Sequence, residues 1–206
     1  MSEIKPEFIK AHTPCVFFHH IIPSKLIDLM VEEVDKMEEG YAPTISSSGK
    51  LEGAKTGNLD EALYNKEVRN SKIGWWFESH WVSSIFSHYI AIANKQQWEY
   101  DLNVLLGIQV STYEAPDGHY KWHSDYGTSK NNEFTRKLSA SLLLTDPEDY
   151  EGGDLEFIDY HGNNILSPKE RGSIIVFDSR IPHRVTPVTK GKRCSLVTWM
   201  YGPKLR

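Results

Sequence analysis

Two stretches in the N-terminal half of the chain place apolar residues three and four positions apart, the spacing of one buried helix face. The first begins after Pro23 and the second after Ser79, a residue type that caps helices. The apolar positions are Leu26, Met30, Val34 and Met37 in the first stretch, and Val82, Phe86, Tyr89 and Ala93 in the second. Runs of strand character precede each helix, at 14–22 and 71–77.

Between these elements, residues 41–60 are rich in Ser, Gly and Thr and contain little that could be buried. Such a segment in a compact domain predicts a mobile loop that is either functional or passive.

After Leu102 the pattern changes to short strand-like runs separated by turn signals such as Pro116-Asp117-Gly118 and Lys190-Gly191. Closely spaced short strands are typical of a sandwich, jelly roll or small barrel. The runs are NVLLGIQVSTY, KWHSDY, RKLSASLLLT, GDLEFIDY, NNILSP, GSIIVF, HRVTPV and RCSLVTWMY. We expect one domain over 1–206, mainly β, in which residues 1–102 provide helical and strand support for a core at 103–203.

The composition excludes some classes of function but does not identify one. The 206 residues carry a formal net charge of −5, and 39% of them are hydrophobic. An acidic balance without a basic patch argues against a nucleic-acid partner. We find no apolar run of membrane-spanning length and no signal-peptide pattern, and the two cysteines have no zinc-site spacing. These features predict a cytoplasmic protein with no membrane partner.

The stretch YKWHSDYG contains the first candidate for chemistry, His123 and Asp125. If the stretch is a strand, these two side chains project from the same face. Alone, such a pair is more typical of a solvated strand edge. Together with His183, near the start of a later strand, it completes the two-histidine, one-carboxylate set of non-haem Fe(II) oxygenases.

A candidate anion site accompanies this set. Arg193 and Ser195 lie two positions apart in a predicted strand and therefore face the same way. A guanidinium pairs bidentately with a carboxylate, and a neighbouring hydroxyl adds a donor. The phenol of Tyr113 could reach the same anion.

These motifs resemble the Fe(II)- and 2-oxoglutarate-dependent oxygenases, most closely the prolyl 4-hydroxylase-like branch. The resemblance extends from about 103 to 203 and rests on Tyr113, HSD at 123–125, YEGGDLEF at 150–157, His183 and RCS at 193–195. It implies a double-stranded β-helix, or jelly roll. It also implies that His123, Asp125 and His183 bind Fe(II), and that Arg193, Ser195 and Tyr113 hold the distal carboxylate of 2-oxoglutarate. Collagen-type and plant-type relatives generally carry Lys at the Arg193 position, so the Arg is closer to oxygen-sensing and bacterial relatives.

The resemblance also suggests residues that line the substrate groove. Trp199 shares a strand face with Arg193, and Arg69 resembles a substrate-contacting arginine of prolyl hydroxylases. In the pair Trp75-Trp76 one ring must face the core; Trp76 is assigned to the groove.

The predicted function is therefore prolyl 4-hydroxylation of a peptide or protein, with Fe(II), 2-oxoglutarate and O₂ as cofactors and ascorbate as a further candidate. Decarboxylation of 2-oxoglutarate to succinate accompanies it. The retained carboxylate of Asp125 favours hydroxylation over halogenation. In the resembled enzymes a segment near 41–60 folds over the peptide, which makes that loop a candidate lid. Two alternatives stay open: a hydroxylase of a free amino acid or small metabolite, and a cupin-like metal-binding module without turnover, which would not need Arg193 and Ser195.

Overall fold

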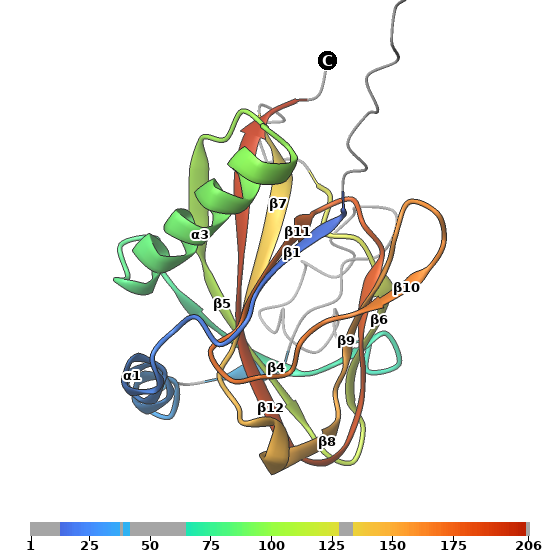
Figure 1. Cartoon of the computed structure of the whole chain (residues 1–206). Coiled ribbons are helices and arrows are strands. Elements are labelled where there is room, and N and C mark those ends of the chain that lie inside the picture. Colours follow the sequence, from blue (N-terminus) through green and yellow to red (C-terminus); the bar gives the residue numbers. More distant parts are fainter. Residues whose placement is uncertain (1–12, 38, 42–64, 128–133, 205–206) are drawn as a thin grey trace, which may run out of the picture.

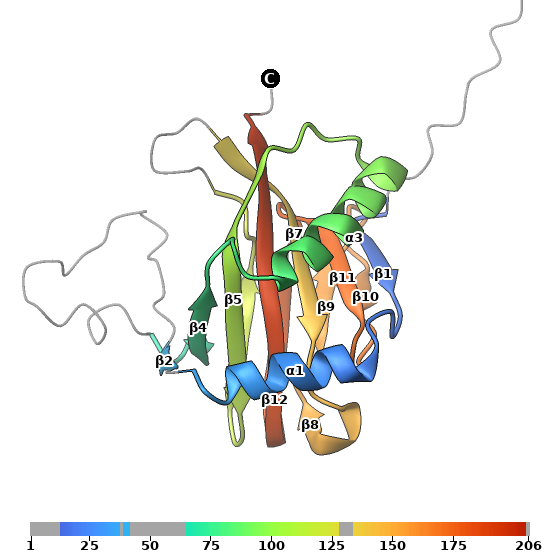
Figure 2. The same cartoon turned by 90° about the vertical axis from the view of Figure 1, so that its left-hand side faces the viewer.

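A computed structural model describes residues 13–37, 39–41, 65–127 and 134–204. Two sheets face each other, and two helices cover the outer face of the longer sheet (Figures 1 and 2). The helices are α1 (Ser24–Val34) and α3 (Val82–Gln97). This arrangement is the predicted jelly roll with helical support.

The longer sheet has the strand order β1-β11-β7-β12-β5-β4-β2. Its strands are β1 (Cys15–Phe18), β11 (Ile174–Asp178), β7 (Phe134–Leu143), β12 (His183–Pro203), β5 (Val104–Glu114), β4 (Lys72–Trp76) and β2 (Gly40–Tyr41). The second sheet is built on the first part of β12, which pairs with β6 (Gly118–His123), β8 (Tyr150–Gly152) and β9 (Leu155–Ile158). Its edges are β3 (Arg69–Asn70), beside β6, and β10 (Asn164–Leu166), beside β9; a short 3₁₀ helix, η1 (Pro147–Asp149), precedes β8.

Strand β12 corrects the prediction of two strands separated by a turn at Lys190-Gly191. It is one strand of 21 residues whose second part pairs with β5 and β7 in the longer sheet. Gly191 pairs with Tyr150 of β8 at a φ of +71°, and a Cβ there would lie 2.1 Å from the Asp149 carbonyl oxygen. Gly191 therefore lets the strand bend closely past η1 without ending.

Two hydrophobic cores lie on opposite faces of the longer sheet. The first joins α1 and α3 to the sheet, and Cys194, Leu196 and Met200 of β12 project into it. The second lies between the sheets and includes Tyr113 and Phe177. As predicted from alternation, Arg193 and Ser195 face away from Cys194 and Leu196, which places them between the two sheets.

The helix periodicity is confirmed, but three of the assigned positions differ. Met30 and Val34 are buried in α1, and Val82, Phe86 and Ala93 are buried in α3, as predicted. Leu26 and Tyr89 are only partly buried, with Ile27 and Ile90 at the fully buried positions instead, and Met37 lies beyond the end of α1. The predicted cap at Ser79 is wrong. Helix α3 begins at Val82, after a turn in which His80 N–H donates to the Phe77 carbonyl oxygen (2.9 Å). Glu33 of α1 accepts from His80 and from the Trp81 indole, so contact between the helices fixes this turn.

The predicted strand at 14–22 is shorter, because β1 ends at Phe18 and His20 has a φ of +44°. Of the predicted loop 41–60, Tyr41 ends β2, and 42–60 lie outside the described residues. Within the described parts of the chain, neither helix is both long and apolar enough to cross a membrane.

Candidate metal centre and anion pocket

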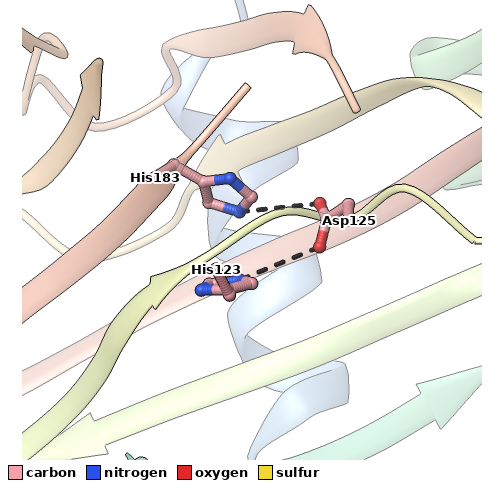
Figure 3. A group of neighbouring side chains, drawn as sticks. All are labelled: His123, Asp125 and His183. Atoms are coloured by element: carbon pink, nitrogen blue, oxygen red, sulfur yellow. Dashed lines mark ion pairs between the residues drawn. The ribbon is translucent and has the colours of Figure 1, made fainter. Parts of the chain in front are cut away.

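Three side chains converge between the sheets and could hold one metal ion: His123, Asp125 and His183 (Figure 3). Asp125 Oδ1 lies 3.8 Å from His123 Nε2, and Oδ2 lies 3.6 Å from His183 Nε2. One ligand atom from each residue lies within 4.8 Å of the others. Two imidazole nitrogens and a carboxylate oxygen, with no thiolate, suit Fe(II) better than a structural zinc ion.

Backbone pairing brings the two histidines together, since His123 at the end of β6 pairs with His183 at the start of β12. Asp125 corrects the sequence argument: it follows the end of β6, so it does not share a strand face with His123. Its loop is held by Arg136 of β7, which donates from the backbone to the Gly127 carbonyl oxygen (3.0 Å) and from the side chain to that of Asp125 (3.4 Å).

Each histidine ring is oriented by its other nitrogen. Nδ1 of His123 lies 2.8 Å from the Lys121 carbonyl oxygen, and Nδ1 of His183 lies 3.0 Å from that of Ile181. A carbonyl oxygen only accepts, so it fixes the proton on Nδ1 and leaves the Nε2 lone pair facing Asp125.

The electrostatic environment also favours the protonation states in which His123 and Asp125 can bind a metal ion. Burial, together with the nearby His183, lowers the pKa of His123 to about 3. Burial alone would raise the pKa of Asp125, but His183 and His123 outweigh it and hold that pKa below its usual range. At neutral pH the cluster therefore offers a neutral His123 imidazole and a carboxylate.

Arg193 is the main feature of the neighbouring pocket. Only 2% of it is exposed, and its Nη1 donates to Ser195 Oγ at 3.0 Å. Its guanidinium carbon lies 5.5 Å from the centre of the Tyr113 ring. Its Nε has no hydrogen-bond partner, and among the described residues no carboxylate forms an ion pair with it. A buried guanidinium without an anion is unfavourable, so the geometry fits a bound carboxylate.

Several of the residues around Arg193 are small. Ser195 pairs across the sheet with Ser111 and with Leu143, and Ser139 and Ser141 of β7 share the inward face with them. Gly153 has a φ of +61°, and a Cβ there would lie 2.9 Å from Arg193 Cδ. Small side chains and this glycine therefore shape the pocket around the guanidinium.

Of the predicted groove residues, Trp199 and Arg69 lie between the sheets and Trp76 does not. Arg136 lies over the Trp199 ring at 4.2 Å, and Arg69 lies over the Tyr120 ring at 4.6 Å. Arg69 is buried and its Nε donates to Ser71 Oγ (2.8 Å).

The assignment of Trp76 to the groove is wrong. Trp76 is buried in the core beneath the helices, where its ring stacks on His80. The Trp75 side chain points to the opposite face of β4 and is half exposed. It contacts Trp199, with ring centres 6.0 Å apart. The dipeptide showed that one ring faces inward; only the pairing of β4 with β5 decides which one.

Sequence reasoning also missed Tyr120 and Arg136. The Tyr120 ring stacks on His123 with centres 3.5 Å apart, because a register shift in β6 brings both side chains to one face. Tyr120 stands inside the quoted motif, so an aromatic residue shortly before the histidine was the available signal. For Arg136 we find no signal in the sequence.

Comparison with known proteins finds a family model and relatives that part of this chain resembles. Residues 108–201 match the family model for the 2OG-Fe(II) oxygenase superfamily. A PKHD-type hydroxylase of Azoarcus sp. is 35% identical over 91 residues, 43% of this chain and 40% of the relative. One of Colwellia psychrerythraea is 31% identical over 139 residues, 55% of this chain and 62% of the relative. The chain thus spans about two fifths of the length of the curated relatives it matches first.

Solved structures show the same fold at low identity. A Pseudomonas putida prolyl-4-hydroxylase has a TM-score of 0.66 at 21% identity, covering 94% of both chains. A prolyl hydroxylase from Trichoplax adhaerens, in complex with a hypoxia inducible factor oxygen degradation domain peptide fragment, has a TM-score of 0.69 at 15% identity. It covers 92% of this chain and 84% of that one.

Proposed function

We propose that this chain is an Fe(II)- and 2-oxoglutarate-dependent dioxygenase of the prolyl 4-hydroxylase-like branch. The proposal is supported by the match of residues 108–201 to the family model of the 2OG-Fe(II) oxygenase superfamily, by the similarity to PKHD-type hydroxylases and by the fold shared with a prolyl-4-hydroxylase. The reaction is hydroxylation of a C–H bond, with prolyl 4-hydroxylation of a peptide or protein favoured. The observation that carries the proposal is the buried Arg193, which has no carboxylate partner among the described residues, beside a cluster of two histidines and a carboxylate.

In this proposal His123, Asp125 and His183 hold Fe(II) through two Nε2 atoms and one carboxylate oxygen. When bound, iron with 2-oxoglutarate and O₂ supplies the oxidising chemistry that couples decarboxylation to hydroxylation. The chain's own contribution begins with ligand orientation, since the carbonyl oxygens of Lys121 and Ile181 fix both imidazole tautomers.

Arg193 would bind the distal carboxylate of 2-oxoglutarate, with Ser195 and Tyr113 beside it. Nη1 of Arg193 donates to Ser195 Oγ, so Nε and Nη2 would donate the two parallel hydrogen bonds to the carboxylate. Because Arg193 and His183 belong to one strand, β12 would fix the position of the cosubstrate relative to the metal. Trp199, Trp75 and Arg69 are proposed to line the substrate side of the site.

Peptide hydroxylation is supported by the fold shared with prolyl hydroxylases, one of which was solved with a peptide fragment. The test measures succinate release from 2-oxoglutarate with proline-containing peptides and, in parallel, with free amino acids. Turnover with peptides supports the proposal, and turnover with a free amino acid alone would transfer the assignment to the small-molecule alternative. No 2-oxoglutarate binding at all would favour the non-catalytic metal-binding module. Ascorbate dependence and a cytoplasmic location stay predictions.

A further inference from the structure

A buried carboxylate lies at the end of β11, directly before the turn that leads to His183. Asp178 is fully buried, and it is not one of the three candidate metal ligands. Its Oδ1 accepts from the Arg180 backbone N–H and from Arg180 Nε, both at 2.9 Å. Its Oδ2 accepts from the Tyr100 hydroxyl at 2.7 Å and from the Tyr160 hydroxyl at 3.3 Å. A buried carboxylate with this many donors is strongly fixed in place.

Asp178 also holds the turn through its main chain. Its carbonyl oxygen accepts from the Ile181 N–H at 3.0 Å. The Ile181 carbonyl oxygen in turn lies 3.0 Å from His183 Nδ1, the contact that orients the imidazole. Hydrogen bonds, together with the backbone of the turn at Arg180 and Ile181, therefore connect Asp178 to the ring of His183.

The two tyrosines tie this turn to distant parts of the fold. Tyr100 follows α3 and packs against the core beneath the helices. Tyr160 lies in the turn between β9 and β10, in the second sheet. The Asp178 cluster, defined as Asp178, Arg180, Tyr100 and Tyr160, thus anchors the β11–β12 turn to both layers.

Alternate side chains of β11 point to opposite faces of the sheet, and this alternation separates Asp178 from the metal site. Phe177 faces inward and its ring packs edge-on against His183, with centres 4.8 Å apart. Asp178 is its neighbour in the strand and has the alternate direction, like Val176, which lies in the core beneath the helices. Asp178 therefore acts on the metal site only through the turn.

We propose that Asp178 is the positioning residue for His183: the cluster holds the β11–β12 turn so that His183 Nε2 faces Asp125, and this sets the affinity of the metal site. The proposal rests on the proposed function, because it assumes that His183 is a metal ligand. Removal of a group that hydrogen-bonds a metal ligand directly typically changes metal affinity by about 10- to 100-fold. Asp178 acts through Ile181, so we expect a change near the lower end of that range.

The test titrates metal-free protein with Co(II) and follows the visible absorption bands, well below the melting temperature. Asp178→Asn keeps the shape and removes the charge, and Tyr100→Phe removes one hydroxyl. We expect the Co(II) dissociation constant to rise about tenfold or more for Asp178→Asn and less for Tyr100→Phe, with altered band shapes. Ile90→Ala, in the buried core of α3, is the control that lowers the melting temperature without touching the turn.

An unchanged dissociation constant in Asp178→Asn and Tyr100→Phe, with only a lower melting temperature as in Ile90→Ala, would overturn the proposal and leave the cluster a purely stabilising role. If Asp178→Asn does not fold, Tyr100→Phe and Arg180→Lys decide the question by the same titration. Wild-type protein that binds no Co(II) would instead contradict the metal site of the proposed function.

Discussion

Replacing Arg193 with Met should have opposite effects on ligand binding and on the stability of the ligand-free protein. Met removes the guanidinium but keeps much of the side-chain volume. In the ligand-free state Arg193 is 2% exposed, its Nε has no hydrogen-bond partner, and its Nη1 donates to Ser195 Oγ. An uncompensated buried charge is unfavourable, so its loss should leave the melting temperature unchanged or raise it.

The loss of affinity for 2-oxoglutarate can be estimated from the number of hydrogen bonds that the substitution removes. A bidentate pair contains two charge-assisted hydrogen bonds, each worth about 1.5–3 kcal/mol. Together they amount to about 3–6 kcal/mol, and about 1.4 kcal/mol corresponds to a factor of ten in the dissociation constant. In the wild type the bound carboxylate also compensates the buried charge of Arg193, and the variant loses this contribution to binding as well. We therefore expect the dissociation constant to rise by about two to four orders of magnitude.

Isothermal titration of the metal-loaded protein with 2-oxoglutarate, without O₂, measures the affinity, and thermal unfolding of the ligand-free protein measures stability. Arg171→Met is the matched control, because Arg171 pairs with Asp28 and donates to the Leu144 carbonyl oxygen. It should lose stability and keep its affinity for 2-oxoglutarate. Arg193→Met with unchanged affinity would refute the assignment of the pocket, whatever its melting temperature.

Three further predictions concern the same region. His183→Ala should abolish metal binding, measured by Co(II) titration, while leaving circular dichroism largely unchanged; retained stoichiometric binding would contradict the proposed ligand set. Gly153→Ala should weaken 2-oxoglutarate binding, because a Cβ would lie 2.9 Å from Arg193 Cδ, and should also destabilise the protein by about 1–2 kcal/mol through its φ of +61°; an unaltered affinity in titration would show that the pocket tolerates the shift. Finally, the metal-free protein should lose stability as the pH falls from about 6.5 toward 3, because the pKa of His123 is about 3 in the folded state and near 6.5 when unfolded, so that the unfolded state binds more protons. Urea unfolding of wild type and His123→Phe at pH 7 and pH 5 checks this, and an equal pH dependence in both would exclude His123 as the cause.

Much of the fold could be predicted because each element has its own local pattern. The apolar spacing of α1 and α3 predicts helices, and alternation along β12 predicts that Arg193 and Ser195 face away from Cys194 and Leu196. The candidate residues His123, Asp125, His183 and Arg193 could be selected from residue type and order, since metal and anion binding demand particular donor atoms.

Properties that depend on partners distant in sequence were decided only by the tertiary structure. Whether β12 ends at Gly191 depends on pairing with β8, and which of Trp75 and Trp76 faces the site depends on the register of β4 against β5. Asp125 reaches the histidines from a loop, held by Arg136, and not from the strand face that the sequence suggested. The Asp178 cluster joins residues separated by as many as 80 positions. Local pattern determined the elements and the donor atoms, whereas pairing, register and burial determined where those atoms meet, because they arise only when distant segments pack together.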